Sequence, residues 1–281
     1  MGPNQFQPID PNRDAQGFYQ LQRPHSNLYK KVTYQTRETL VLDRITEYDI
    51  RSANTTMLRQ AGRMKTRDLK ALEELPKKER EIAIGKMIRL DKSIRQPIAK
   101  GIIRAKLDLF RSNGIQDDEV LAIKNDAVFI RGRRLRNTQF GVVEFRPKNT
   151  YALYLKLEGI EYYYDAREKR VDLKGVKDEV LEEPDHQNGM LLFLARCMDY
   201  LVMDRRDALR RYLIEFVDDY KSKRLPVRYY RELNRDNCYR TTMEISGMSF
   251  SLIVATEDDK DMINGVYNYK RFVLPIIQRF M

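Results

Sequence analysis

Apolar and polar positions along the chain change their spacing near residue 54. The preceding stretch ETLVLDRITEYDIRSA (residues 38–53) alternates as a strand or hairpin does, and the alternation ends near Asp49. From about residue 54 to 111 the apolar positions take the spacing that is typical of helices, and Asn113-Gly114 is a typical helix end. The pattern predicts a strand that ends in a carboxylate, followed by a helical insertion.

Strand-like alternation returns after this insertion. The stretch DEVLAIKNDAVFIRG (residues 118–132) has apolar runs on both sides of a polar tip, which predicts a β-hairpin with Asp126 at its turn. Residues 138–176 predict three or four further short strands, punctuated by glycines. Residues 187–223 have helical periodicity, which Pro226 ends. Strands and helices in this order predict an α+β protein.

The run EYYYDA (residues 161–166) places three tyrosines side by side in one predicted strand. Exposed aromatic rings in such a row could stack on nucleic-acid bases. Tyrosine is also a favourable strand residue, and a strand with one buried and one exposed face explains the run without a ligand. The second interpretation is favoured.

The composition narrows the classes of function. The chain of 281 residues has 52 lysines and arginines against 41 acidic residues, a formal charge of +11, and this surplus favours a polyanion such as nucleic acid. No apolar run approaches the roughly 18 residues of a membrane span, so an intracellular, cytoplasmic protein is expected. With two cysteines and two histidines, redox, zinc and histidine-dependent nucleophilic chemistry are disfavoured. Catalysis would rest on carboxylates, lysines and metal ions.

Three short motifs follow one another between residues 49 and 127. Residues 49–56 read DIRSANTT, residues 77–86 read KKEREIAIGK and residues 124–127 read KNDA. In this order they resemble the motifs D-x-x-S-L-Y-P-S, K-x-x-x-N-x-x-Y-G-K and D-T-D-S of the family B DNA polymerases. The chain keeps the acid and serine of the first motif, the outer lysines and glycine of the second, and the second acid of the third. Asn54 replaces a tyrosine, and Lys124 replaces an acid.

Two further sites extend the resemblance to about residues 38–225. Residues 141–144 (GVVE), followed by residues 148–151 (KNTY), are similar to the primer-gripping strand of these enzymes. Lys174-Gly175 is similar to a Lys-Gly pair that precedes their thumb. The agreement of order and spacing at five places supports the resemblance more than any single motif does.

The resemblance implies a division into domains. It implies an antiparallel palm sheet with helices and a helical thumb, on which these boundaries follow: irregular lead-in 1–36, palm 37–53 and 112–180, fingers-like insertion 54–111, thumb-like region 181–281. The chain has no room for the proofreading exonuclease domain of a full-length member. The resemblance therefore implies a minimal or split, phage-type DNA polymerase, active in the host cytoplasm.

The resemblance also assigns the catalytic residues. Nucleotidyl transfer uses two divalent ions bridged by carboxylates from different backbone elements. Asp49 and Asp126 would supply these carboxylates, and the backbone carbonyl of Ile50 would complete the oxygen ligands that Mg²⁺, or Mn²⁺ in its place, prefers.

Binding residues follow from the same motifs. The nucleoside triphosphate would contact the fingers-like helix and the start of the first motif: Lys77, Arg80, Lys86, Ser52 and Asn54. The DNA primer-template would contact residues further along the chain, since lysines suit phosphates: Lys148, Tyr151 and Lys174. Ser52 and Asn54 have an alternative interpretation, as residues that end a strand or cap the next helix.

Two other functions remain open. Lys124 in place of an acid favours a catalytically inactive, polymerase-like subunit that binds DNA within a replication complex. Asn54 in place of the tyrosine that excludes a 2′-hydroxyl favours a primase or another RNA-synthesising enzyme.

Overall fold

The computed structural model describes residues 25–62, 64–175, 184–222, 224–225, 240–245, 248–253 and 273–281. These residues form two compact units. The first unit contains the described residues up to Tyr34, with Ile50–Ala127 and Leu135–Arg146; the second contains Gln35–Asp49, Val128–Arg134 and the described residues from Pro147 onward. Helices and antiparallel sheets make up both, which confirms the predicted α+β class.

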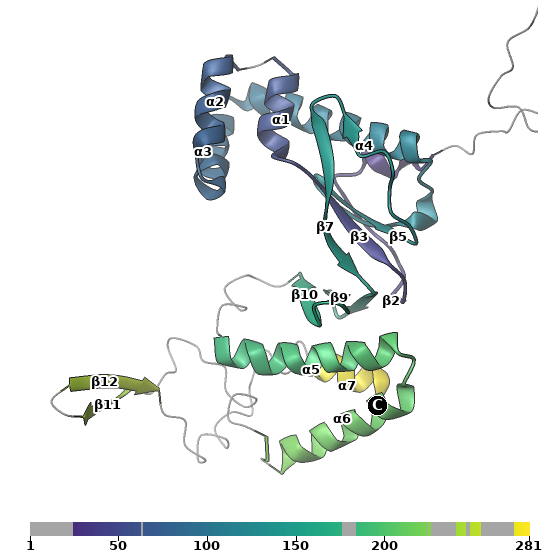
Figure 1. Cartoon of the computed structure of the whole chain (residues 1–281), viewed down its shortest axis with the longest axis vertical. Coiled ribbons are helices and arrows are strands. Elements are labelled where there is room, and N and C mark those ends of the chain that lie inside the picture. The colour runs from purple at the N-terminus through teal and green to yellow at the C-terminus, as the bar shows by residue number, and fades with distance from the viewer. Residues whose placement is uncertain are drawn as a thin grey trace, which may run out of the picture. The chain divides into compact units, whose positions relative to one another are not determined.

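The described residues of the predicted insertion are mostly helical. Its helices α1 (Ala53–Gln60), α2 (Thr66–Glu74), α3 (Lys77–Leu90) and α4 (Arg95–Asn113) lie at the top of Figure 1. The 3-10 turn η2 (Lys92–Ile94) comes between α3 and α4 in the sequence. Helix α4 ends at Gly114, whose φ of 57° suits glycine, as the Asn-Gly pair predicts. Helices α1 and α4 approach closely, because a Cβ atom added to Gly101 would lie 2.5 Å from the sulfur of Met57.

The strands of the described residues form three sheets. The six-stranded sheet has the order β1-β4-β5-β3-β7-β6, from β1 (Thr33–Gln35), β3 (Ile45–Ile50), β4 (Val120–Lys124), β5 (Ala127–Arg131), β6 (Gln139–Phe140) and β7 (Val143–Tyr151). The four-stranded sheet has the order β10-β9-β8-β2, from β2 (Leu40–Val41), β8 (Leu153–Leu157), β9 (Ile160–Asp165) and β10 (Arg170–Lys174). Strands β11 (Arg240–Ile245) and β12 (Met248–Ile253) form a separate antiparallel pair. Short 3-10 turns are η1 (Asn27–Lys30) and η3 (Asp117–Glu119).

The four-stranded sheet is buried on both faces. Tyr162 and Tyr164 pack into an apolar core with side chains of α5 (Pro184–Val202), α6 (Arg206–Lys221) and α7 (Leu274–Phe280). Tyr163 points to the opposite face, where its ring lies 5.0 Å from that of Phe129 and 5.1 Å from that of Tyr151. The prediction of one exposed face for the tyrosine run is therefore wrong, because a second aromatic cluster covers that face.

The helical periodicity of residues 187–223 corresponds to two helices, α5 and α6, which lie together with α7 in Figure 1. The break between them falls at Asp204, whose φ of 50° is incompatible with a continuous helix. Pro226 and much of the predicted thumb-like region lie outside the described residues, as do residues 1–24 of the predicted lead-in. Among the helices described here, none has the length and apolar character that crossing a membrane requires.

Candidate functional site

Strand β3 carries Asp49 at its carboxyl end. Ile45, Tyr48 and Ile50 are buried, whereas Asp49 is half-buried, so its carboxylate lies where the strand leaves the core. Side chains alternate along a strand, and Glu47 therefore shares the side of β3 on which Asp49 lies. The strand that the sequence predicts, with an acid at its end, is present.

The residues after Asp49 make a sharp turn into helix α1. Ser52 has a left-handed backbone with φ of 48° and occupies the position before the helix, but its side chain makes no capping hydrogen bond. The hydroxyl of Thr55 donates to the Ser52 carbonyl at 2.9 Å. Asn54 is half-buried in the first turn of a helix that begins at Ala53, so the alternative in which Asn54 caps the helix is wrong.

Asp126 lies at the tip of the β4–β5 hairpin, as predicted. The turn consists of Asn125, whose φ is 57°, and Asp126 itself. Asparagine tolerates this left-handed conformation better than most residues do. The backbone N–H of Asn125 donates to the Val32 carbonyl at 2.8 Å, which ties the tip to the segment before β1.

A buried lysine beneath this turn escaped the sequence analysis. Lys106, on helix α4, is 1% exposed, and its ammonium donates to the carbonyls of Lys31 at 2.6 Å and Asn125 at 3.2 Å. Burial lowers the pKa of Lys106 to about 8, and the charge of nearby Asp126 opposes part of that shift. Its place in the apolar spacing of α4 was the available signal, since a lysine rarely occupies a core position.

Asp49 lies on β3, and Asp126 lies in the turn that directly precedes β5. Within the second unit, β5 is the neighbour of β3, and just beyond these strands the N–H of Gly132 donates to the Arg44 carbonyl at 2.8 Å. Asp49 belongs to the second unit and Asp126 to the first, and their joint metal-binding role stays a prediction.

No cluster of three or more His, Cys, Asp or Glu side chains suited to a metal ion occurs among the described residues. Asp49, Asp126 and the Ile50 carbonyl are nevertheless hard oxygen ligands of the kind that Mg²⁺ prefers.

The predicted triphosphate ligands lie on helix α3. Lys77 and Lys86 are exposed and Arg80 is half-buried. The Lys77 ammonium lies 3.9 Å from the carboxylate of Glu81, one helical turn away, and this exposed pair costs little to break. The ammonium group of Lys77 can therefore exchange Glu81 for a new anionic partner at little cost.

Positive charge is concentrated in the helical region around them. Residues 51–113, which contain α1–α4, have 17 lysines and arginines and 7 aspartates and glutamates, a net charge of +10. The rest of the chain has 35 basic and 34 acidic residues, a net charge of +1. The basic character of this insertion is visible in the sequence, and the count shows that it holds nearly all of the surplus charge of the chain. A region of this charge attracts polyanions through counterion release.

Tyr151 belongs to a closed polar network in the second unit. Its hydroxyl lies 2.8 Å from Asp172 and 3.2 Å from Glu47. Because one hydroxyl hydrogen serves one acceptor at a time, we assign the hydrogen to the shorter contact, with Asp172. Burial raises the pKa of Tyr151, and the charges of Glu47 and Asp172 raise it further.

Asn149 and Arg170 close the network. Asn149 donates to the Glu47 carboxylate at 2.8 Å, and Arg170 donates to Asn149 at 3.4 Å and to Asp172 at 3.0 Å. Glu47, 3% exposed, also has the Lys148 ammonium at 3.5 Å. The network ties β3, β7 and β10 together and compensates two carboxylates that are largely removed from water.

The predicted nucleic-acid contacts of this region differ in exposure. Lys148 is exposed, although its ammonium faces Glu47, and Lys174 is half-buried at the end of β10. Tyr151 is 1% exposed with its hydroxyl engaged, so its position leaves no surface for direct contact with a primer.

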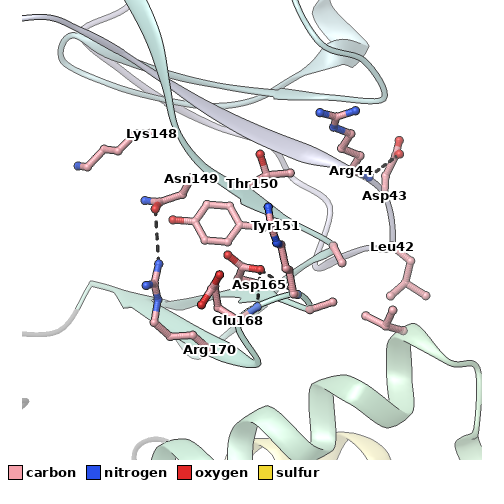
Figure 2. Close-up of a pocket in the computed structure, with 14 residues that line it drawn as sticks. Leu42, Asp43, Arg44, Lys148, Asn149, Thr150, Tyr151, Asp165, Glu168 and Arg170 are labelled. Atoms are coloured by element: carbon pink, nitrogen blue, oxygen red, sulfur yellow. Dashed lines mark hydrogen bonds between the residues drawn. The ribbon is translucent and has the colours of Figure 1, made fainter.

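A pocket of about 810 Å³ opens beside this network (Figure 2). Its walls are the segments 42–44, 148–152 and 165–170, with Val202. Asp165 accepts hydrogen bonds from the backbone N–H groups of Arg167 and Glu168, which shapes the β9–β10 turn on one wall. Cationic and anionic side chains are mixed along the pocket, which suits a polar ligand without selecting one class.

These features define an α+β protein with a strongly basic helical insertion and a half-buried carboxylate at the end of a central strand. The chain belongs to the family of the bacteriophage PBS1 gene 130 protein, whose family model matches residues 24–281. No curated protein matches the chain.

Proposed function

We propose that the chain is a template-directed nucleotidyltransferase of the DNA polymerase type, which uses two divalent metal ions. The observation that carries the proposal is the order of strands: β3, which bears Asp49, neighbours β5, which begins directly after Asp126. The basic helices α1–α4 are inserted between these two strands in the sequence. Two acids from separate backbone elements, one at a strand end and one at a hairpin tip, suit a two-metal site.

Mg²⁺, when bound, would neutralise the charge that develops on the transferred phosphoryl group and orient the attacking hydroxyl. Asp49, Asp126 and the Ile50 carbonyl would hold it through oxygen atoms, and the substrate phosphates would complete its coordination. Because phosphates supply part of the coordination, two protein carboxylates are enough for the site.

The nucleotide would be bound by the helical region. Lys77, Arg80 and Lys86 would neutralise its phosphates, supported by the net charge of +10 over residues 51–113. Ser52 and Asn54, at the turn from β3 into α1, would lie on the sugar side of the nucleotide.

The DNA primer-template is the proposed macromolecular partner. Lys148, which is exposed, and Lys174, at the end of β10, would contact its backbone, with Tyr151 supporting this segment from within through Glu47 and Asp172. Membership of a phage family supports action inside an infected host cell, where other replication subunits are further partners.

A nucleic-acid-binding subunit without catalytic activity is the second candidate. Two observations favour it. Lys124 lies at the end of β4, at a position where the family B DNA polymerases have an acid. The helical region carries nearly all of the surplus positive charge. Such a subunit would bind primed DNA as strongly as a polymerase does.

One experiment separates these functions. The full chain is incubated with a primed DNA template, Mg²⁺ and labelled deoxyribonucleotides or ribonucleotides. Template-dependent extension with deoxyribonucleotides supports the polymerase, and extension mainly with ribonucleotides supports an RNA-synthesising enzyme. Retention of the template without extension supports the inactive subunit, and neither retention nor extension contradicts both candidates.

A further inference from the structure

Lys106 is the most unusual buried group in the first unit. It lies on α4 among residues that face the core, such as Ile102, Ala105 and Leu109, and is 1% exposed. An ammonium group removed from water costs free energy unless hydrogen bonds compensate it. A methionine or leucine would fill the same space without that free-energy cost. A lysine at this position therefore indicates that its hydrogen-bond donors have a function.

The donors of Lys106 are directed at two backbone carbonyls. One belongs to Lys31, at 2.6 Å, and the other to Asn125, at 3.2 Å, the residue directly before Asp126. The Asn125 N–H also donates to the Val32 carbonyl at 2.8 Å. The hairpin tip is thereby fixed to α4 and to Val32 by hydrogen bonds at both backbone polar groups of one residue, Asn125.

The hydrogen bonds that hold the hairpin tip affect the position of the Asp126 side chain. Asn125 has a left-handed backbone with φ of 57°, which asparagine tolerates, and the hydrogen bonds at its N–H and carbonyl help to hold the turn in this conformation. The direction of the backbone after Asn125 determines the position of the Asp126 Cα atom, from which the carboxylate side chain extends. A misplacement of about 1 Å in a reacting group can cost about 100-fold in rate.

We propose that Lys106 is a positioning residue, which holds the tip of the β4–β5 hairpin and so fixes the place of the Asp126 carboxylate. The proposal rests on the proposed function, in which Asp126 binds metal. In this role Lys106 acts through the backbone of Asn125 and not by contact with the substrate or the metal.

The test compares Lys106→Met, which keeps the length of the side chain and removes its donors, with Lys106→Arg, which keeps donors. Lys156→Met is the matched control, because it removes a lysine hydrogen bond of 2.8 Å to Gln35 in the second unit. Hydrogen exchange of the peptide that covers residues 120–131 reports the order of the tip. Primer extension with Mg²⁺ gives kcat and the KM for the nucleotide.

In Lys106→Met, exchange at the tip should become at least about tenfold faster, since the hydrogen bonds from position 106 to the Lys31 and Asn125 carbonyls are lost. Its kcat should fall at least about tenfold while KM changes less than about twofold, because Asp126 acts on the reaction more than on nucleotide binding. Lys106→Arg should restore most of kcat, and Lys156→Met should behave as the wild type in both measurements.

The outcomes separate the two levels of the proposal. Unchanged exchange at the tip in Lys106→Met overturns the positioning role. Faster exchange with an unchanged kcat reduces Lys106 to a structural residue and also overturns it. A wild-type chain that extends no primer refutes the proposed function instead, and the exchange measurement then still decides whether Lys106 holds the hairpin tip.

Discussion

The buried ammonium of Lys106 makes the stability of the protein depend on pH. Its pKa is lowered from 10.5 to about 8 in the folded chain, so the folded state binds this proton more weakly than the unfolded state does. The free-energy cost of the buried charge is fully present below pH 8 and disappears as the pH rises past 10.5, the pKa of Lys106 in the unfolded chain. The contribution of this residue to stability therefore increases from pH 8 towards pH 10.5.

The size of the effect follows from the shift. One pKa unit corresponds to about 1.4 kcal/mol, so the lowered pKa of Lys106 corresponds to about 3 kcal/mol in all. Between pH 7 and pH 9 the gain should be about 1 kcal/mol, and by pH 10 about 2–3 kcal/mol. Other groups oppose it, because burial raises the pKa of Cys197 and of the buried tyrosines, whose contributions fall as pH rises.

Comparison with Lys106→Met removes these other contributions, since both proteins share them. Unfolding by urea, followed by circular dichroism at 222 nm with a metal chelator present, gives the free energy of unfolding of each protein at pH 7, 9 and 10. The difference, wild type minus variant, should rise by about 2–3 kcal/mol across this range. A difference that stays constant with pH would refute a buried, compensated ammonium at position 106.

Three further predictions concern the sugar, the polar network and the helical region. Asn54→Tyr should lower ribonucleotide use relative to deoxyribonucleotide use by about 1–3 kcal/mol, and an unchanged ratio of incorporation rates contradicts a place at the sugar. Tyr151→Phe removes the hydroxyl shared by Glu47 and Asp172 and should lower the free energy of unfolding in urea by about 1–3 kcal/mol at pH 7; an unchanged value means that the network adds no stability. The affinity for duplex DNA should fall with salt, with a log–log slope of about −0.9 for each phosphate contacted, and a flat titration leaves the charge of residues 51–113 without a nucleic-acid role.

Local pattern was sufficient to predict the elements that carry the site. The alternation around Asp49, the polar tip at Asp126 and the helix end at Asn113-Gly114 are each encoded within a few residues. These signals survive in the fold because strand burial, turn conformation and helix termination are all decided locally. The break at Asp204 was missed, although residues 204–207 (DRRD) are all charged and interrupt the apolar spacing.

Features that depend on tertiary contacts were not predictable. Tyr163 is buried because Phe129 and Tyr151, distant in sequence, cover its face of the sheet. In the sequence, Lys106 resembles the exposed cations of a basic helix. Only the fold brings the carbonyls of Lys31 and Asn125 to its ammonium group. Pairing partners far apart along the chain leave no trace in local periodicity.

The two-metal proposal is tested most directly by Mg²⁺-dependent primer extension with Asp49→Asn and Asp126→Asn. Asp118→Asn is the matched control, because Asp118 is exposed in η3, close in sequence to the hairpin and outside the proposed site. Each of the two site variants should lose at least about 100-fold in extension rate, since each removes a metal ligand, while folding and DNA binding stay near the wild-type level. The control should extend normally. Extension near the wild-type rate by either site variant would contradict the assignment of these carboxylates.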